Sequence, residues 1–113
     1  MLPHPIHGLS WEGFVIEQVC NLVRDSATPM FYRTAEGAEI DLLLEWHKTR
    51  ELWAIEIKLT LATKVSRGFY VGIDTLKTNR NFIVCADSKT QNISPAVECY
   101  KLVDSLEMLS DYV

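Results

Sequence analysis

A chain of 113 residues with 48% hydrophobic and 23% charged residues has the composition of one ordinary globular domain. It contains no apolar run near the roughly 20 residues that cross a bilayer, so no membrane segment is expected. The net charge of −4 comes without any cluster of Lys and Arg, which argues against a domain that holds nucleic acid through a basic face of its own.

Residues 1–7 are rich in Pro and His and are interpreted as a linker or boundary, with no secretory signal, while residues 8–113 are predicted to form a single domain. Cys20, Cys85 and Cys99 are widely spaced, and no C-x-x-C pair predicts a zinc or redox site. Free thiols favour a reducing cytoplasm. This composition suits a piece cut from a longer cytoplasmic protein.

The first predicted helix covers residues 10–24, with Ser10 as its N-cap and the acidic Glu12 in its first turn. A break at 25–29 precedes a short strand at 30–33. Apolar residues recur at helical spacing and predict a buried stripe. They are Trp11, Phe14, Val15, Val19, Leu22 and Val23.

Two segments that alternate with period two, 38–46 and 52–59, predict a β-hairpin whose turn is residues 47–50. One face of each strand is apolar and is expected to be buried. The apolar set is Ile40, Leu42, Leu44 and Trp46 in the first strand and Trp53, Ile55, Ile57 and Leu59 in the second.

The opposite face of this hairpin is charged. The turn sets a register in which Asp41 lies opposite Glu56, and Glu39 lies opposite Lys58. Directly opposed acids destabilise a sheet unless a cation lies between them, and Mg²⁺ favours one or two carboxylates with waters and phosphates. The alternative is an ordinary solvent-exposed face in which Glu39 and Lys58 form a cross-strand ion pair.

The rest of the chain predicts a helix at 64–77, an apolar strand at 81–86, a polar loop at 87–95, a strand at 98–103 and a helix at 105–111. Strands followed by a helical crossover indicate an α/β (α+β) domain with a mixed central sheet flanked by helices. No internal repeat is present.

An acid in one strand followed by E-x-K in the next resembles the PD-(D/E)xK superfamily of metal-dependent nucleases, with Ile40 in place of the usual proline. The ordered residues over about 8–86 also resemble a domain of unknown function that lies C-terminal to the ATP-binding module of prokaryotic AAA-type ATPases. They are Trp11-Glu12-Gly13-Phe14-Val15, Tyr32-Arg33-Thr34 with Gly37, Glu39 and Asp41, and Ile55-Glu56-Ile57-Lys58.

The resemblance implies a restriction-endonuclease-like α-β-β-β-α-β core. It also implies that Asp41, Glu56 and the carbonyl of Ile57 bind Mg²⁺ or Mn²⁺, that Lys58 positions the attacking water or offsets developing charge, and that Glu12 contributes from the helix. Its partners would be nucleic acid and the N-terminal ATPase module of the same protein. No G-x-x-x-x-G-K-[ST] loop is present here, so this chain is not that module.

Three hypotheses stay open at this point. The domain is a metal-dependent nuclease that acts with an ATPase, or a catalytically silent nuclease-like module that regulates or binds for the ATPase, or a partner-binding unit such as a homo-oligomerisation domain. Intact Asp41, Glu56 and Lys58 favour the first, and the acidic balance favours the other two.

Overall fold

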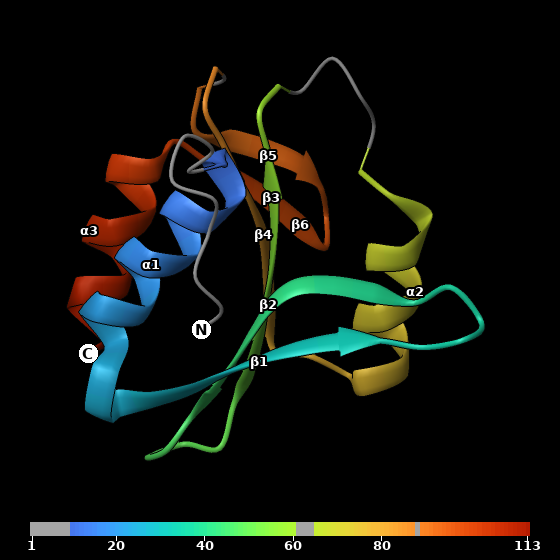
Figure 1. Ribbon diagram of the computed structural model, residues 1–113, viewed down its shortest axis with the longest axis horizontal. Coiled ribbons are helices and arrows are strands. Elements are labelled where there is room, and N and C mark those ends of the chain that lie inside the picture. Colours follow the sequence, from blue (N-terminus) through green and yellow to red (C-terminus); the bar gives the residue numbers. More distant parts are fainter. Residues whose placement is uncertain (1–9, 61–64, 88) are drawn as a thin grey trace.

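A computed structural model describes residues 10–60, 65–87 and 89–113, so the predicted linker at 1–7 lies outside it. A six-stranded mixed sheet has helices α1 and α3 on one face and α2 on the other (Figure 1). The predicted α/β class is confirmed. In chain order the elements are α1 (Trp11–Val23), η1 (Arg24–Ser26), β1 (Ala27–Arg33), β2 (Glu39–Trp46), β3 (Leu52–Lys58), α2 (Arg67–Leu76), β4 (Arg80–Cys85), β5 (Gln91–Ser94), β6 (Val97–Tyr100) and α3 (Leu102–Tyr112).

The strand order is β1-β2-β3-β4-β6-β5. Strands β1, β2 and β3 pair antiparallel, β4 is parallel to both β3 and β6, and β5 returns antiparallel to β6. The prediction of a loop at 87–95 is wrong in part, because β5 lies within it. Strand β5 is an edge strand in which Ile93 is the single apolar residue, so it has no apolar alternation to reveal it. The first strand also begins at Ala27 and not at residue 30.

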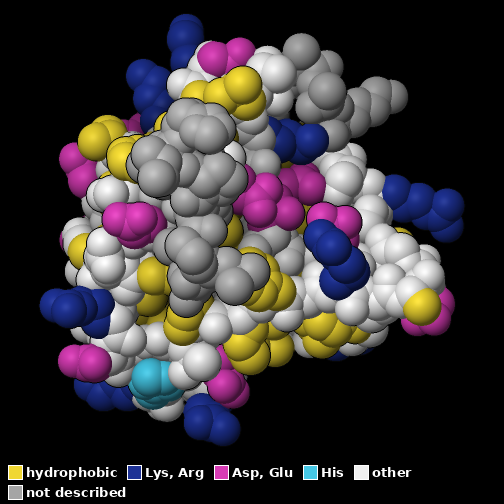
Figure 2. All heavy atoms as spheres, in the orientation of Figure 1, with side chains coloured by type: hydrophobic (Ala, Val, Ile, Leu, Met, Phe, Trp, Pro, Cys, Tyr) yellow, Lys and Arg dark blue, Asp and Glu magenta, His cyan; other side chains and the backbone are white. Residues whose placement is uncertain are grey.

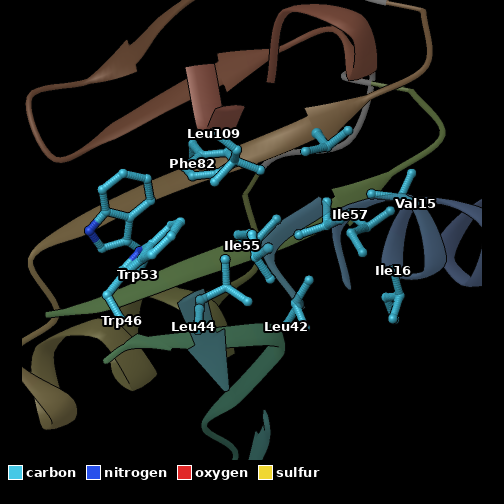
Figure 3. Close-up of a cluster of buried hydrophobic side chains, with 14 residues drawn as sticks. Val15, Ile16, Leu42, Leu44, Trp46, Trp53, Ile55, Ile57, Phe82 and Leu109 are labelled. Atoms are coloured by element: carbon cyan, nitrogen blue, oxygen red, sulfur yellow. The ribbon is translucent and has the colours of Figure 1, made fainter. Parts of the chain in front are cut away.

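Two buried layers hold the sheet between its helices. The α1/α3 side packs side chains from β2, β3 and β4 against α1 and α3 (Figure 3). The α2 side packs Ile40, Leu43 and Ala54 around Phe69 of α2. Ser10 caps α1 as predicted, since its Oγ accepts a hydrogen bond from the Gly13 backbone N–H at 3.0 Å. Contrary to the predicted stripe, Phe14 is exposed, and Ile16 is buried.

A β-bulge changes the predicted faces of β2. Met30 pairs with Leu43, but Tyr32 pairs with Ile40, so two residues of β2 oppose the single Phe31 of β1. The extra residue reverses the alternation. Ile40 therefore packs on the α2 side, away from Leu42, and the prediction that both share one face is wrong.

Helix α2 lies very close to β2, and two glycines permit this approach. A Cβ at Gly68 would lie 2.6 Å from the Gly37 carbonyl oxygen, and one at Gly72 would lie 2.9 Å from Ile40 Cγ1. A side chain at Gly68 would collide with backbone, so that position needs glycine, and a side chain at Gly72 would force Ile40 to shift. The first turn of α2 is thus pressed against the segment of β2 that carries Asp41.

Candidate acidic site

The predicted charged residues come from three elements that meet near one end of the sheet. Asp41 lies near the start of β2, Glu56 and Lys58 lie near the carboxyl end of β3, and Glu12 lies in the first turn of α1. Figure 2 shows acidic side chains gathered near the centre of this face, between the regions of α1 and α2. Ligands of open α/β sheets characteristically bind at the carboxyl ends of parallel strands, and β3 is such a strand beside β4.

Asp41 lies where β2 and β3 separate. The predicted register is confirmed from Glu45 opposite Leu52 to Leu42 opposite Ile55, and the backbone pairing extends no further. Asp41 does not pair with Glu56 in the ladder as predicted. Its Oδ2 instead accepts a hydrogen bond from the Ile57 backbone N–H at 2.9 Å. The carboxylate thus accepts a hydrogen bond from a backbone N–H of β3 that has no partner in the β2–β3 ladder.

Burial raises the pKa of the Asp41 carboxyl to about 6, and this effect outweighs the hydrogen bond from Ile57, which lowers the pKa. The negative charges of Glu12, Glu56 and Glu39 raise it further. Three acids from separate positions therefore act on Asp41 electrostatically. Such an accumulation costs folding free energy and is characteristic of sites that bind a cation or move a proton.

Glu56 is 7% exposed, and its carboxylate is held by helix α2. Ser66, the N-cap of α2, donates its hydroxyl to Glu56 Oε1 at 2.6 Å and its backbone N–H to Oε2 at 3.3 Å. The same Ser66 Oγ accepts the Phe69 backbone N–H at 3.1 Å. One serine therefore caps the helix and orients the site carboxylate.

The other predicted residues, Glu12, Glu39 and Lys58, are less buried than Glu56. The Glu12 side chain belongs to an exposed position of α1, although its charge reaches Asp41. Glu39 forms an ion pair with Arg33 across β1 and β2, with 3.2 Å between Oε2 and Nη2, in place of the predicted pairing with Lys58. Lys58 is partly buried, and its carbonyl oxygen accepts the Ala86 backbone N–H at 3.3 Å.

The carboxylates at this site match the small number of protein ligands that Mg²⁺ needs. Over residues 10–60, 65–87 and 89–113, no group of three or more His, Cys, Asp or Glu side chains forms a ready-made metal cage. Mg²⁺ does not require one, because it is bound through one or two carboxylates together with waters and phosphates. Asp41 uses one oxygen for Ile57, so its second oxygen remains for a cation, and each Glu56 oxygen has further lone pairs.

Sequence reasoning missed Ser66 and the bulge. A serine directly before an apolar helical stripe is an N-cap signal, and it would have placed the start of α2 correctly. No local pattern could have shown that this cap reaches Glu56. The bulge depends on the fit between β1 and β2, so it also leaves no local signal.

Hollows lie at both ends of β2. One of about 350 Å³ borders the acidic site and contains Phe31, Arg33 and Asp41 in its wall. A larger one of about 600 Å³ lies at the opposite end of β2, beside His47 and Tyr112. His47 there approaches Thr28 Oγ1 at 2.6 Å and the Asp25 carbonyl oxygen at 2.9 Å, so both ring nitrogens serve to fix the turn.

Comparison with known proteins places the chain among proteins of unassigned role. Residues 7–102 match a family described as "Domain of unknown function (DUF4143)". Uncharacterized proteins of Mycobacterium bovis and Mycobacterium tuberculosis are each 37% identical over 82 residues, which is 72% of this chain and 18% of theirs. The chain therefore spans less than a fifth of the length of these relatives.

No solved structure matches this chain significantly. Within the described part of the chain, no helix is long and apolar enough to cross a membrane. None of Cys20, Cys85 and Cys99 forms a disulfide.

Proposed function

Because the chain belongs to the family described as "Domain of unknown function (DUF4143)", whose description assigns no activity, we propose a function from the acidic site itself: metal-dependent hydrolysis of phosphodiester bonds in nucleic acid. The observation that carries this proposal is Asp41, held by the Ile57 N–H and crowded by further carboxylates where β2 and β3 separate. The same residues match the acid and E-x-K pattern of the PD-(D/E)xK nucleases.

Asp41 and Glu56, with the Ile57 carbonyl, would hold the cation, and Glu12 would join through water. When bound, Mg²⁺ or Mn²⁺ lowers the pKa of a water and offsets the charge that develops on the phosphate. Lys58 positions the attacking water or donates to a phosphate oxygen. The attacking water would give up one proton to solvent as its oxygen bonds to phosphorus and the ester P–O bond breaks, and the leaving oxygen would take up one proton from solvent.

The partners belong to the same proposal. We propose that the domain acts beside the ATPase module of a longer chain, which would supply the nucleic-acid affinity that a net charge of −4 does not favour. The short span of the match within its mycobacterial relatives supports a role as one part of a larger protein.

A silent regulatory, binding or dimerisation module is the second candidate, and Glu56 favours it. Both oxygens of Glu56 already accept hydrogen bonds from Ser66. Because these hydrogen bonds already satisfy the buried carboxylate, its burial does not require a bound metal. The two functions differ in whether Glu56 and Asp41 bind a cation together.

Calorimetric titration of Mg²⁺ and Mn²⁺ into the wild type, Asp41→Asn and Glu39→Gln separates the two. We expect binding heat in the wild type, its loss in Asp41→Asn and its retention in Glu39→Gln. Glu39→Gln is the matched control, because it removes an acid of the same strand whose charge is already paired with Arg33. Circular dichroism of each variant controls for folding. If the wild type gives no binding heat either with or without an oligonucleotide, the nuclease hypothesis is rejected and the silent module remains.

Cleavage then tests the chemistry directly. At least one of the labelled substrates, single-stranded or duplex DNA or RNA, should be cut in Mg²⁺ by the wild type and not by Lys58→Ala, while the metal titration of Lys58→Ala stays unchanged. Cleavage that persists in both Lys58→Ala and Asp41→Asn would indicate a contaminating nuclease and contradict the proposal.

A further inference from the structure

Strand β1 presents an aromatic ring and a guanidinium group beside Asp41. Met30 and Tyr32 pack into the buried layer on the α2 side, so Phe31 and Arg33 lie on the opposite face of the strand. That is the face from which Glu12 of α1 acts on Asp41. Phe31 is 72% exposed although it lies in a strand of the central sheet, and the Arg33 side chain is 76% exposed.

The surface around Phe31 is hollow on both sides. The groove of about 350 Å³ bordering the acidic site has polar and apolar walls, formed by Phe31, Tyr32, Arg33, Glu39, Ile40 and Asp41. An apolar hollow of about 140 Å³ lies on the other side, formed by Ile16, Cys20, Pro29, Met30, Phe31 and Leu42. The Phe31 ring therefore separates an acidic groove from an apolar one. A flat ring in this position can receive another ring from either side.

We propose that this groove binds unpaired nucleotides, with one base stacked on Phe31 and the neighbouring phosphate on Arg33, so that single-stranded nucleic acid is the substrate class. The inference rests on the proposed function, because it places the strand beside Asp41. Arg33 is held in the groove by Glu39 at 3.2 Å and can exchange that carboxylate for a phosphate without leaving the surface.

The preference for unpaired nucleotides follows from how the two substrate classes are held. Affinity for duplex comes chiefly from many phosphate contacts, which the acidic composition of this chain disfavours. Duplex bases are already stacked on each other, so they do not engage Phe31. An unpaired base stacks on an aromatic side chain and improves affinity about 5- to 150-fold per base, whatever its identity.

The test measures binding of a short fluorescein-labelled oligothymidylate, and of a hairpin duplex, by anisotropy in EDTA. Wild type should prefer the single strand. Phe31→Ala should weaken that binding about 5- to 150-fold, and Phe31→Trp should restore it. Tyr70→Ala removes an exposed aromatic residue from α2, on the other side of the sheet, and is expected to change nothing. Arg33→Ala should reduce the salt dependence of log K by about 0.7.

A stacking signal separates contact from structural damage. An oligonucleotide carrying 2-aminopurine should lose fluorescence on binding to wild type and keep more of it with Phe31→Ala. Equal affinity of wild type and Phe31→Ala, or a preference for duplex, overturns the inference. A change of oligomeric state in Phe31→Ala, seen by light scattering, would assign Phe31 to a protein contact. Metal titration judges the proposed function separately, because neither Phe31 variant touches the carboxylates.

Discussion

The two ends of the β2–β3 hairpin differ sharply although the same two strands form both. At the turn end, Trp53 contacts Trp46 and Tyr112 at ring-centroid distances of 5.1 and 4.5 Å. Its Nε1 donates to Glu51 Oε1 at 2.9 Å, and the Arg80 guanidinium lies 5.2 Å from its ring centroid. Apolar contact, hydrogen bonding and cation–π attraction all favour the folded state there.

At the other end, the pairing stops and charge accumulates. Asp41 accepts the hydrogen bond that a strand partner would otherwise take, and its pKa rises because burial and neighbouring acids penalise its charge. The turn end therefore stabilises the hairpin enough to carry an unfavourable charged end. Under the proposed function, stability would come from one end of the strand pair and activity from the other, and substitutions can test that separation.

The largest expected effect lies at the turn end. Trp53 is 2% exposed, so Trp53→Ala should lower the free energy of unfolding by about 3–5 kcal/mol, measured by urea denaturation. Leu59, expected on the buried face of its strand, is 65% exposed because β3 ends at Lys58. Leu59→Ala, just beyond the charged end, should therefore stay within about 0.5 kcal/mol of wild type. A loss below about 1 kcal/mol in Trp53→Ala would contradict the assignment of stability to the aromatic cluster.

The next effect joins α2 to the charged end. Ser66→Ala removes a helix cap and a hydrogen bond to a buried carboxylate, so it should cost about 2–3 kcal/mol in urea denaturation. Ser10→Ala removes a cap of the same chemistry from α1, with no carboxylate attached, and should cost about 1 kcal/mol. Equal losses in the two variants would show that Ser66 serves only its helix and does not hold Glu56.

The register of β2 and β3 was predictable, because two alternating segments and a turn length together permit only one pairing that buries the apolar faces. The predicted pairing of Asp41 with Glu56 is wrong, because the ladder stops at Leu42 opposite Ile55, although the charge of Glu56 still acts on Asp41. The error at Ile40 has an equally physical cause. A bulge inserts one residue, and strict alternation cannot continue through it.

The partners of the charged residues were not predictable to the same degree. Ser66 binds Glu56 from ten positions away through the docking of α2, and Arg33 meets Glu39 through the pairing of β1 with β2. Both contacts depend on tertiary placement, about which a local pattern carries no information. Phe31 resembles any strand residue in the sequence, and its 72% exposure depends on how the elements pack, which a local pattern does not show.

A smaller effect is expected from pH. The raised pKa of Asp41, about 6 when folded, means that the native state holds a proton that the unfolded state releases nearer pH 4. Its contribution to stability is therefore complete below about pH 4 and is lost as the pH rises through 6. Allowing for solvent screening, wild type should lose about 1–2 kcal/mol relative to Asp41→Asn across this range, measured in EDTA.

Asparagine is the appropriate comparison, because its amide oxygen can still accept the Ile57 N–H while its charge is absent. Above pH 6 we expect Asp41→Asn to be more stable than wild type. Other groups titrate in both proteins, so the difference between them isolates Asp41. A difference that grows in favour of wild type as the pH rises would show that Asp41 stabilises the fold as a charged group, and the charged end would then resemble the turn end.

The smallest effect concerns the ion pair of Arg33 and Glu39. Both side chains are largely exposed, so a double-mutant cycle with Arg33→Ala and Glu39→Ala should give a coupling below about 1 kcal/mol that fades at high salt. Such a value means that the pair contributes little to folding, so Arg33 can release Glu39 for a phosphate at little cost. A larger coupling that resists salt would instead make the pair part of the hairpin's structure, and it would oppose phosphate binding at Arg33.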